Sequence, residues 1–322
     1  MKKRVCDWRA AIASLDPASA RMPVTLHAAQ LLLSRGLTAE AVEAYREFLV
    51  RFPQNHGAQE SLGYLLRRLG REDESVAVLR EAARIEAVKY GSDADVQRFL
   101  AAADRSAEPP DKAPPVFITK LYEDFAPRFE PLLVNELGYR GPEILLDAVT
   151  RVIGADTCGL NVIDLGCGTG LAGVAFSPRA RRLSGVDLSE SMIALAAAKG
   201  VYDELAVGDV VEHLKQLRNP VDLVLAADVF VYLGDLAPVF AAARTALRPG
   251  GWLAFTVESG TQDGDAYLLQ AVRRYAHPRG YLLHAAAEAG LETLLIEECS
   301  TRREATLPVR SFVAVMSTPL EI

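Results

Sequence analysis

Two acids and three glycines stand where a nucleoside could be bound. A short apolar run predicts a buried strand that ends just after Asp164. Gly166, Gly168 and Gly170 follow it, and such a turn lets the backbone approach a ligand closely because no Cβ intervenes. The next apolar run ends at Asp187, whose carboxylate can take a ribose diol. Open α/β sheets bind ligands at the carboxyl ends of their strands, so these residues predict a nucleoside-cofactor site.

Two cofactors compete for this glycine turn. Gly168, Gly170 and Gly173 fit the dinucleotide pattern G-x-G-x-x-G. Gly166, Gly168 and Gly170, preceded by Asp164, fit the pattern that binds S-adenosylmethionine (SAM). In the dinucleotide frame the first glycine, Gly168, lies four residues beyond Asp164, which is too far for a turn that should start at the strand end. In the SAM frame the glycines begin two residues after it, which favours SAM.

A family resemblance supports this choice. From about residue 117 to 316 the chain resembles class I SAM-dependent methyltransferases. The matches occur in the expected order, at 162–170 (VIDLGCGTG), 185–189 (GVDLS), 207–209 (VGD), 221–228 (VDLVLAAD) and 247–252 (LRPGGW). The resemblance implies an α/β fold of Rossmann-like type, with a mostly parallel seven-stranded sheet and an antiparallel C-terminal hairpin. It also implies SAM as the cofactor.

The same resemblance implies a set of cofactor contacts. Asp209 would accept a hydrogen bond from the adenine amino group, and the Val210 amide would donate to the ring; Asp209 could equally cap a helix. Cys167 is expected to be a small loop residue and not a nucleophile. The residues expected to bind the cofactor are Asp164, Gly166, Cys167, Gly168, Gly170, Asp187, Leu188, Asp209, Val210, Ala227, Tyr122 and Phe129.

Aromatic residues before the first strand suggest a lid. Tyr122, Phe125 and Phe129 cluster at helix-like spacing. In similar methyltransferases a segment of this kind folds over the cofactor and excludes water from the reacting sulfonium. Plain packing of aromatic side chains in a helix is the alternative.

A general base is needed only if the acceptor is not already reactive, and a metal is not expected. The candidates that follow strands are Asp228, Tyr232, Glu258 and His277. We select His277 as the catalytic base, because residues 274–277 resemble a recurring segment of methyltransferases linked to tetratricopeptide (TPR) repeats and histidine accepts a proton near neutral pH. The alternative is a local hydrogen bond at the start of a helix over 277–289.

The N-terminal region repeats at a period of 34 residues. Residues 22–55 and 56–89 align at this period, which is typical of TPR helix–turn–helix units. The whole chain resembles bacterial predicted methyltransferases that carry TPR repeats. We expect TPR-like helices over 1–105, a proline-rich linker over 106–116 and the methyltransferase domain with its lid helices over 117–322. The repeats could dock a protein partner, or only pack as a helical flank.

Composition restricts partners and compartment. The 322 residues carry a net charge of −7, without the basic face of a nucleic-acid binder. Its four cysteines show no C-x-x-C spacing, so neither a zinc site nor a disulfide framework is expected. Membrane-length apolar runs and a signal-peptide core are not seen, which predicts a cytoplasmic enzyme without membrane partners. The expected acceptor is a small molecule or a carrier-bound group; the alternatives are a protein substrate docked by the repeats, or a SAM-binding scaffold without turnover.

Overall fold

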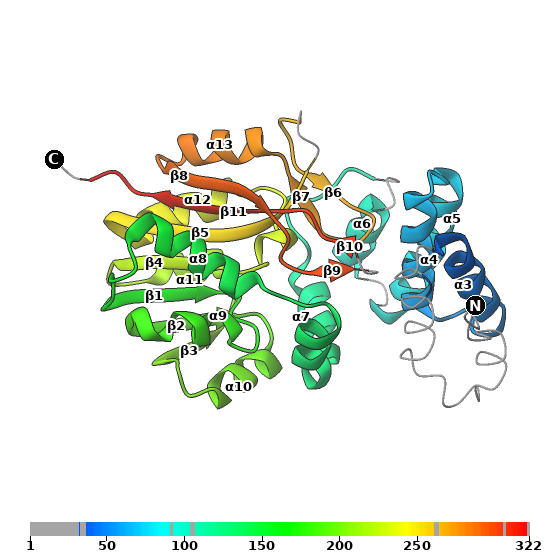
Figure 1. Ribbon diagram of the computed structural model, residues 1–322, viewed down its shortest axis with the longest axis horizontal. Coiled ribbons are helices and arrows are strands. Elements are labelled where there is room, and N and C mark those ends of the chain that lie inside the picture. The colour runs from blue at the N-terminus through cyan, green and yellow to red at the C-terminus, as the bar shows by residue number, and fades with distance from the viewer. Residues whose placement is uncertain are drawn as a thin grey trace, which may run out of the picture. The chain divides into compact units, whose positions relative to one another are not determined.

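The protein divides into two compact units, between Glu108 and Pro109. The structure is a computed structural model (Figure 1), and it describes residue 32 and residues 37–90, 93–103, 107–260, 264–304 and 307–320. Each unit has its own hydrophobic core and is treated separately below. Among the helices that the structure describes, none combines the length and the apolar character that a membrane crossing requires.

The first unit consists of helices. They are α3 (Thr38–Arg51), α4 (His56–Arg68), α5 (Glu72–Tyr90) and α6 (Ala94–Ala103). Helices α4 and α5 approach closely at Gly63, where a Cβ would lie 2.5 Å from a Leu79 side-chain atom. The buried Ser75 hydroxyl donates to the Gly63 carbonyl at 2.8 Å across the same contact. Small residues at this crossing therefore allow the close packing of the pair.

These helices cover the second predicted repeat and part of the first. Residues 56–89 form the pair α4 and α5. Most of the first helix of the 22–55 unit lies outside the described residues, although Leu32 is described and buried. The TPR assignment of this unit stays a prediction.

The second unit is built on a nine-stranded sheet. Its main path runs β3-β2-β1-β4-β5-β11-β8, with β7 paired to β5 and β6 to β7. The first five strands pair in parallel, and β11 is antiparallel to both β5 and β8. The strands are β1 (Leu160–Leu165), β2 (Ala180–Asp187), β3 (Glu204–Val207), β4 (Val221–Ala226), β5 (Leu247–Ser259), β6 (Leu268–Leu269), β7 (Tyr275–His277), β8 (Glu292–Cys299) and β11 (Ser311–Ser317). The predicted mostly parallel sheet with antiparallel C-terminal strands is confirmed, but β6 and β7 add two short strands to the seven that were predicted.

Helices cover both faces of this sheet (Figure 1). Leu223 and Leu225 of β4 pack toward α8 (Gly141–Ile153) and α9 (Leu171–Phe176), whereas Val224 packs with the opposite set of helices. That opposite set is α11 (Val210–Gln216), α12 (Ala237–Ala246) and α13 (Arg279–Glu288). Because both faces are buried, the central strands read as continuous apolar runs.

Shorter elements connect the strands and the larger helices. They are α7 (Pro115–Phe125), η1 (Ala126–Arg128), η2 (Pro131–Glu136), η3 (Ser177–Arg179), α10 (Glu190–Ala198), η4 (Phe230–Tyr232) and the short pair β9 (Arg303–Glu304) and β10 (Leu307–Pro308). The segment from α7 to η2 occupies the position expected of the lid, before β1.

Two sequence predictions differ from the structure. The helix predicted over 277–289 was wrong at its start: His277 ends β7 and pairs with Ser259, and α13 begins only at Arg279. Pro278 explains this, because the residue before a proline is disfavoured in a helix. The linker predicted over 106–116 also differs, since the chain from Pro109 onward belongs to the second unit.

Candidate functional site

The glycine turn leaves β1 with open space on one side. Gly166, Gly168 and Gly170 all have positive φ angles, of 57°, 55° and 91°. A Cβ on Gly166 would collide with Val229 at 2.6 Å, but a Cβ on Gly168 would meet nothing nearer than 4.0 Å. The two positions therefore serve different purposes. Gly166 permits internal packing, and Gly168 presents bare backbone to a space in which a ligand could lie.

Asp187 joins the end of β2 to this turn. Its carboxylate accepts hydrogen bonds from the Gly168 amide at 3.0 Å and from the Ser189 amide at 2.9 Å. Ser189 in turn caps α10 by accepting from the Met192 amide at 3.2 Å. Burial raises the pKa of Asp187, although these amides oppose the shift. Asp187 therefore contacts the glycine turn directly.

Asp164 is a buried acid with incomplete hydrogen bonding. It is 1% exposed, and its Oδ2 accepts a hydrogen bond of 2.6 Å from the Tyr202 hydroxyl. Its Oδ1 has no hydrogen-bond partner among the described residues. Burial raises the pKa of Asp164 to about 7, with the Tyr202 hydrogen bond opposing the shift. A buried carboxylate oxygen without a donor fits a site completed by a cationic ligand.

Tyr202 also explains the third glycine of the dinucleotide pattern. A Cβ on Gly173 would lie 2.2 Å from the Tyr202 hydroxyl oxygen, and one on Gly185 would lie 2.9 Å from the same ring. Gly173 therefore makes room for the Tyr202 side chain against α9. Tyr202 itself carried no signal in the sequence.

Asp209 caps α11 at the end of β3. Its Oδ1 accepts hydrogen bonds from the Val211 and Glu212 amides at 2.9 and 3.2 Å, and its Oδ2 accepts from Lys112 Nζ at 3.0 Å. Burial would raise the pKa of Asp209, but the lysine and the helix amides outweigh it and the pKa is lowered. Asp209 therefore caps α11, as the alternative expected. Its second oxygen accepts from Lys112, which lies in the segment predicted to be a linker.

The other expected cofactor residues lie along the same edge. Cys167 and Val210 are 5% and 8% exposed, so that mainly their backbone can face a ligand. Burial strongly raises the pKa of the Cys167 thiol, which agrees with a structural and not a nucleophilic residue. Leu188 follows Asp187 directly, and Ala227 follows β4 with its side chain partly buried.

The lid aromatics form a tyrosine-centred cluster. The Tyr122 hydroxyl donates to the Tyr232 hydroxyl at 2.9 Å, and the Tyr122 ring packs edge-on against Phe129 with centroids 5.6 Å apart. Burial and the Tyr232 hydroxyl raise the pKa of Tyr122 well above its usual value. Phe125 packs differently, with the Arg128 guanidinium 5.8 Å from its ring centroid. Tyr122 and Phe129 thus share one cluster, whereas Phe125 packs against an exposed arginine.

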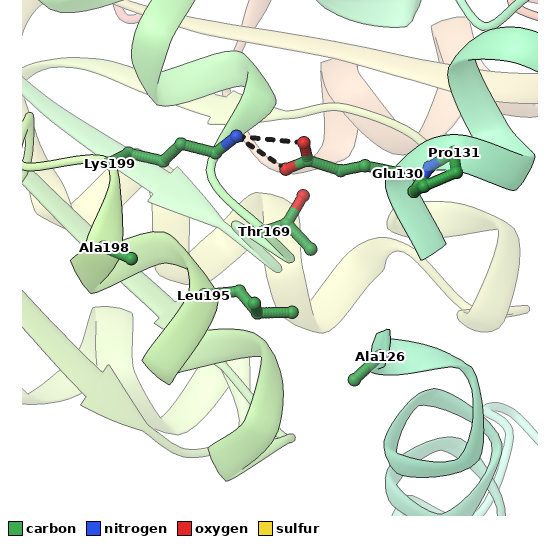
Figure 2. Close-up of a pocket in the computed structure, with 7 residues that line it drawn as sticks. All are labelled: Ala126, Glu130, Pro131, Thr169, Leu195, Ala198 and Lys199. Atoms are coloured by element: carbon green, nitrogen blue, oxygen red, sulfur yellow. Dashed lines mark hydrogen bonds and ion pairs between the residues drawn. The ribbon is translucent and has the colours of Figure 1, made fainter. Parts of the chain in front are cut away.

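A cavity of about 340 Å³ separates the lid from the glycine turn and α10. Figure 2 shows Lys199 of α10 reaching across it to both carboxylate oxygens of Glu130, at 2.8 and 2.9 Å, above Thr169. Burial opposes ionisation of Glu130, but the hydrogen bonds from Lys199 outweigh it and the pKa is lowered. The residues that line the cavity are Ala126, Glu130, Pro131, Thr169, Leu195, Ala198 and Lys199. Neither partner of this ion pair was singled out in the sequence.

Asp228 lies where β4 opens at the carboxyl edge. Its backbone has a φ of 57°, a left-handed conformation that is uncommon outside glycine. The Thr256 hydroxyl donates to Asp228 Oδ1 at 2.8 Å, while Thr301 and Arg302 donate to Oδ2 at 2.9 and 2.8 Å. Three segments distant in sequence therefore converge on this carboxylate.

Arg302 extends this cluster to the end of β5. It is 6% exposed and pairs with Glu258 and Glu304 as well as with Asp228. Arg274 also pairs with Glu258 and Glu304, at 2.6 Å each. Burial would raise the pKa of Glu258, but the two arginines outweigh it and the pKa is lowered. The buried acids here are compensated, in contrast to Asp164.

The structure does not support His277 as a base. Its side chain is fully buried, and Nε2 lies 3.0 Å from the Gly234 carbonyl oxygen, which fixes it as the donor. Its ring packs against the rings of Tyr267 and Tyr281, whose centroids lie 6.4 and 5.6 Å away. Burial lowers the pKa of His277 to about 4. The alternative of a local hydrogen bond at a helix start does not describe it either, because His277 ends β7 and its partner Gly234 lies 43 positions away.

Comparison with known proteins identifies the central part of the chain. Residues 162–251 match the family model described as "Methyltransferase domain". This region is a methyltransferase domain. The protein is accordingly a methyltransferase with SAM as its cofactor, and the matched domain resembles the class I type that the motifs indicated. The described residues hold no cluster of histidine, cysteine and acidic side chains suited to a metal ion.

Individual relatives match over part of their length. A "Ubiquinone biosynthesis O-methyltransferase" of Thiobacillus denitrificans is 29% identical over 43% of this chain and 67% of its own. A "Malonyl-[acyl-carrier protein] O-methyltransferase" of Yersinia pestis is 28% identical over 40% of this chain and 49% of its own. Other relatives named for ubiquinone biosynthesis are covered over only 41% to 63% of their length. A solved methyltransferase from Haloferax volcanii, in complex with its Trm112 activator, is 19% identical with a TM-score of 0.50, covering 64% of this chain and 99% of its own; it shares the fold.

Proposed function

We propose that this protein transfers the methyl group of SAM to an oxygen atom of a small-molecule or carrier-bound acceptor. The observation that carries the proposal is the placement of three acids at the ends of the neighbouring strands β1, β2 and β3, with Asp187 hydrogen-bonded to the open backbone of Gly168. The relatives named O-methyltransferases support oxygen as the accepting atom.

Each acid has a distinct role in this proposal. Asp164, whose Oδ1 is buried without a donor, would hold the methionyl ammonium of SAM. Asp187 would accept hydrogen bonds from the ribose hydroxyls, and Asp209 from the adenine amino group. When bound, SAM supplies a methyl group on a positively charged sulfur, and the chain's own task is mainly to align the acceptor with it and to exclude water.

The acceptor would lie between the lid and the ends of β4 and β5. Tyr122 and Tyr232 meet there by their hydroxyl groups, and the adjoining Asp228 is anchored by Thr256, Thr301 and Arg302. Glu258 is occupied by two arginines, and His277 is buried away from solvent. Burial raises the pKa of Tyr232, and Asp228 pairs with one arginine where Glu258 pairs with two. Of the four base candidates, we therefore assign Asp228 to proton removal from an acceptor hydroxyl.

Calorimetric titration with SAM and with NADH tests the cofactor assignment. Wild type should bind SAM and not NADH. Asp187→Ala should weaken SAM binding by at least about tenfold, because hydrogen bonds to a charged group contribute roughly 1.5–3 kcal/mol each. Glu190→Ala, at the exposed start of α10, is the matched control and should leave the Kd unchanged.

Methyl transfer itself is tested with tritium-labelled SAM. Whole lysate and deproteinised lysate are each incubated with the enzyme, and label is followed in small molecules and in macromolecules. Label in the deproteinised extract supports a free small-molecule acceptor. If no fraction is labelled while SAM binding is retained, the enzymatic proposal fails and the scaffold alternative gains.

A carrier-bound acceptor is the second candidate. The Yersinia pestis relative is named for a carrier protein, and the N-terminal helical unit offers a further surface for docking. Deleting residues 1–105 should then abolish transfer to carrier-bound acceptors but leave SAM binding intact. If labelled proteins are still formed after this deletion, the helices are not needed to dock a protein substrate.

A further inference from the structure

A short segment outside the matched family region forms part of the cofactor site. We call residues 110–113 the strap. The Tyr275 hydroxyl donates to the Pro110 carbonyl at 2.6 Å, and the Asp111 carbonyl accepts from the Gly234 and Asp235 amides at 2.7 and 2.9 Å. These backbone contacts hold the strap against the loop that follows η4, within the segment predicted to be a proline-rich linker.

The second half of the strap is fixed in the same way. Ala113 is buried and its amide donates to the Tyr232 carbonyl at 2.9 Å. Lys112 pairs with Leu233 in an isolated antiparallel bridge. Hydrogen bonds of the neighbouring residues therefore fix the backbone of Lys112 on both sides, and its side chain can still change conformation.

That side chain ends at the acid expected to bind adenine. Lys112 Nζ lies 3.0 Å from Asp209 Oδ2, while Oδ1 is already shared between the Val211 and Glu212 amides at the start of α11. Oδ2 is thus the oxygen that remains for a ligand. An adenine amino group and the Lys112 ammonium are both donors, and they would approach this one oxygen.

We propose that Lys112 is an internal competitor for the adenine subsite, so that the strap sets the affinity of the enzyme for adenine nucleosides. The proposal rests on the role given to Asp209 in the proposed function. It adds Lys112 to the residues that form the cofactor site, and it predicts that replacing this lysine improves cofactor binding.

The test is the equilibrium binding of SAM, S-adenosylhomocysteine and methylthioadenosine to full-length Lys112→Met. Methylthioadenosine carries adenine and ribose but no methionyl ammonium, so it reports on the nucleoside half of the site alone. We expect the Kd of each ligand to fall about twofold to fivefold at low salt, the range of a partly exposed ion pair. Because salt screens such pairs, the gain should shrink at high salt. Lys215→Met is the matched control, since Lys215 lies on α11 but pairs with Glu212.

An Asp209→Asn background separates competition from a structural effect. Without the carboxylate, the Lys112→Met change should alter the Kd by less than a factor of about 1.5, because the competing pair no longer exists. Weaker or unchanged binding of Lys112→Met in the native background overturns the proposal. An equal gain in the Asp209→Asn background overturns it as well. Loss of methyl transfer with intact SAM binding would instead refute the proposed function and leave this comparison valid.

Discussion

Replacing Asp164 by asparagine should change how the stability of the protein depends on pH. Asp164 is 1% exposed, and burial raises its pKa from 3.8 to about 7. The folded state therefore holds a proton on Asp164 that the unfolded state has already lost between these two values. Its contribution to stability is fully present below about pH 4, and it is lost as the pH rises through 7.

The size of the effect follows from the shift. One pKa unit corresponds to about 1.4 kcal/mol, so a shift of roughly three units corresponds to about 4 kcal/mol between low and high pH. Asp164→Asn lacks the titrating group. The free energy of unfolding of the variant, minus that of wild type, should therefore rise by about 2.5 kcal/mol between pH 5 and pH 8. The constant cost of placing an amide beside the Tyr202 hydroxyl cancels in this slope.

Urea denaturation of both proteins at several pH values measures the difference directly. Asp209→Asn serves as the control: the pKa of Asp209 is lowered, so its contribution is lost only as the pH falls below about 4, and its difference curve should be flat from pH 5 to 8. A flat curve for Asp164→Asn as well would show that Asp164 is not buried as a neutral acid, and would refute the reasoning.

Further substitutions probe the other parts of the site. Gly168→Ala should weaken SAM binding by at least about tenfold in titration calorimetry, with a loss of only about 1 kcal/mol in urea denaturation, since its Cβ would enter open space at a positive φ. Lys199→Met should accelerate SAM dissociation by up to about fivefold in stopped-flow measurements, because it removes the partly exposed pair with Glu130; an unchanged rate would rule out a latching role. Arg302→Met should lower the free energy of unfolding by about 3–5 kcal/mol, because Glu258 would lose a buried partner; a loss below about 1 kcal/mol would contradict the buried pairing.

The cofactor half of the site could be predicted because its signals are local. Asp164 and Gly168 lie within one strand and the turn that follows it, and Asp187 ends the neighbouring parallel strand. Parallel pairing then brings these carboxyl ends to one edge without further information. Burial on both faces also explains why the apolar runs indicated the central strands so directly.

The partners of these residues could not be predicted, because they come from distant parts of the chain. Tyr202 lies 38 positions from Asp164, and Lys112 lies 97 positions from Asp209. Neither contact leaves a periodicity or a spacing in the sequence. Proline-rich composition predicted an extended segment around Lys112 correctly, but it could not indicate that the segment is bound to the loop after η4.

His277 shows a related limit of reasoning from motifs. The position follows β5 in the sequence and belongs to the expected edge of the sheet, so placing it near the site was sound. Its protonation, however, depends on burial among side chains of β7 and α13 and on the Gly234 carbonyl. The sequence alone does not show that these groups lie together. Burial of His277 lowers its pKa to about 4, so the side chain is neutral and a weak proton acceptor near neutral pH.

The two halves of the site also differ in how their charges are compensated, and this bears on what each half can bind. Asp164 and Asp187 have raised pKa values, because burial outweighs the hydroxyl and amide donors around them. Glu258 has a lowered pKa, because Arg274 and Arg302 already neutralise it. A cationic ligand therefore gains most beside the first pair, where it supplies the charge that the fold leaves out. At the second half the fold supplies both signs itself, so we expect that an acceptor bound there would be recognised by hydrogen bonds and shape and not by a net charge.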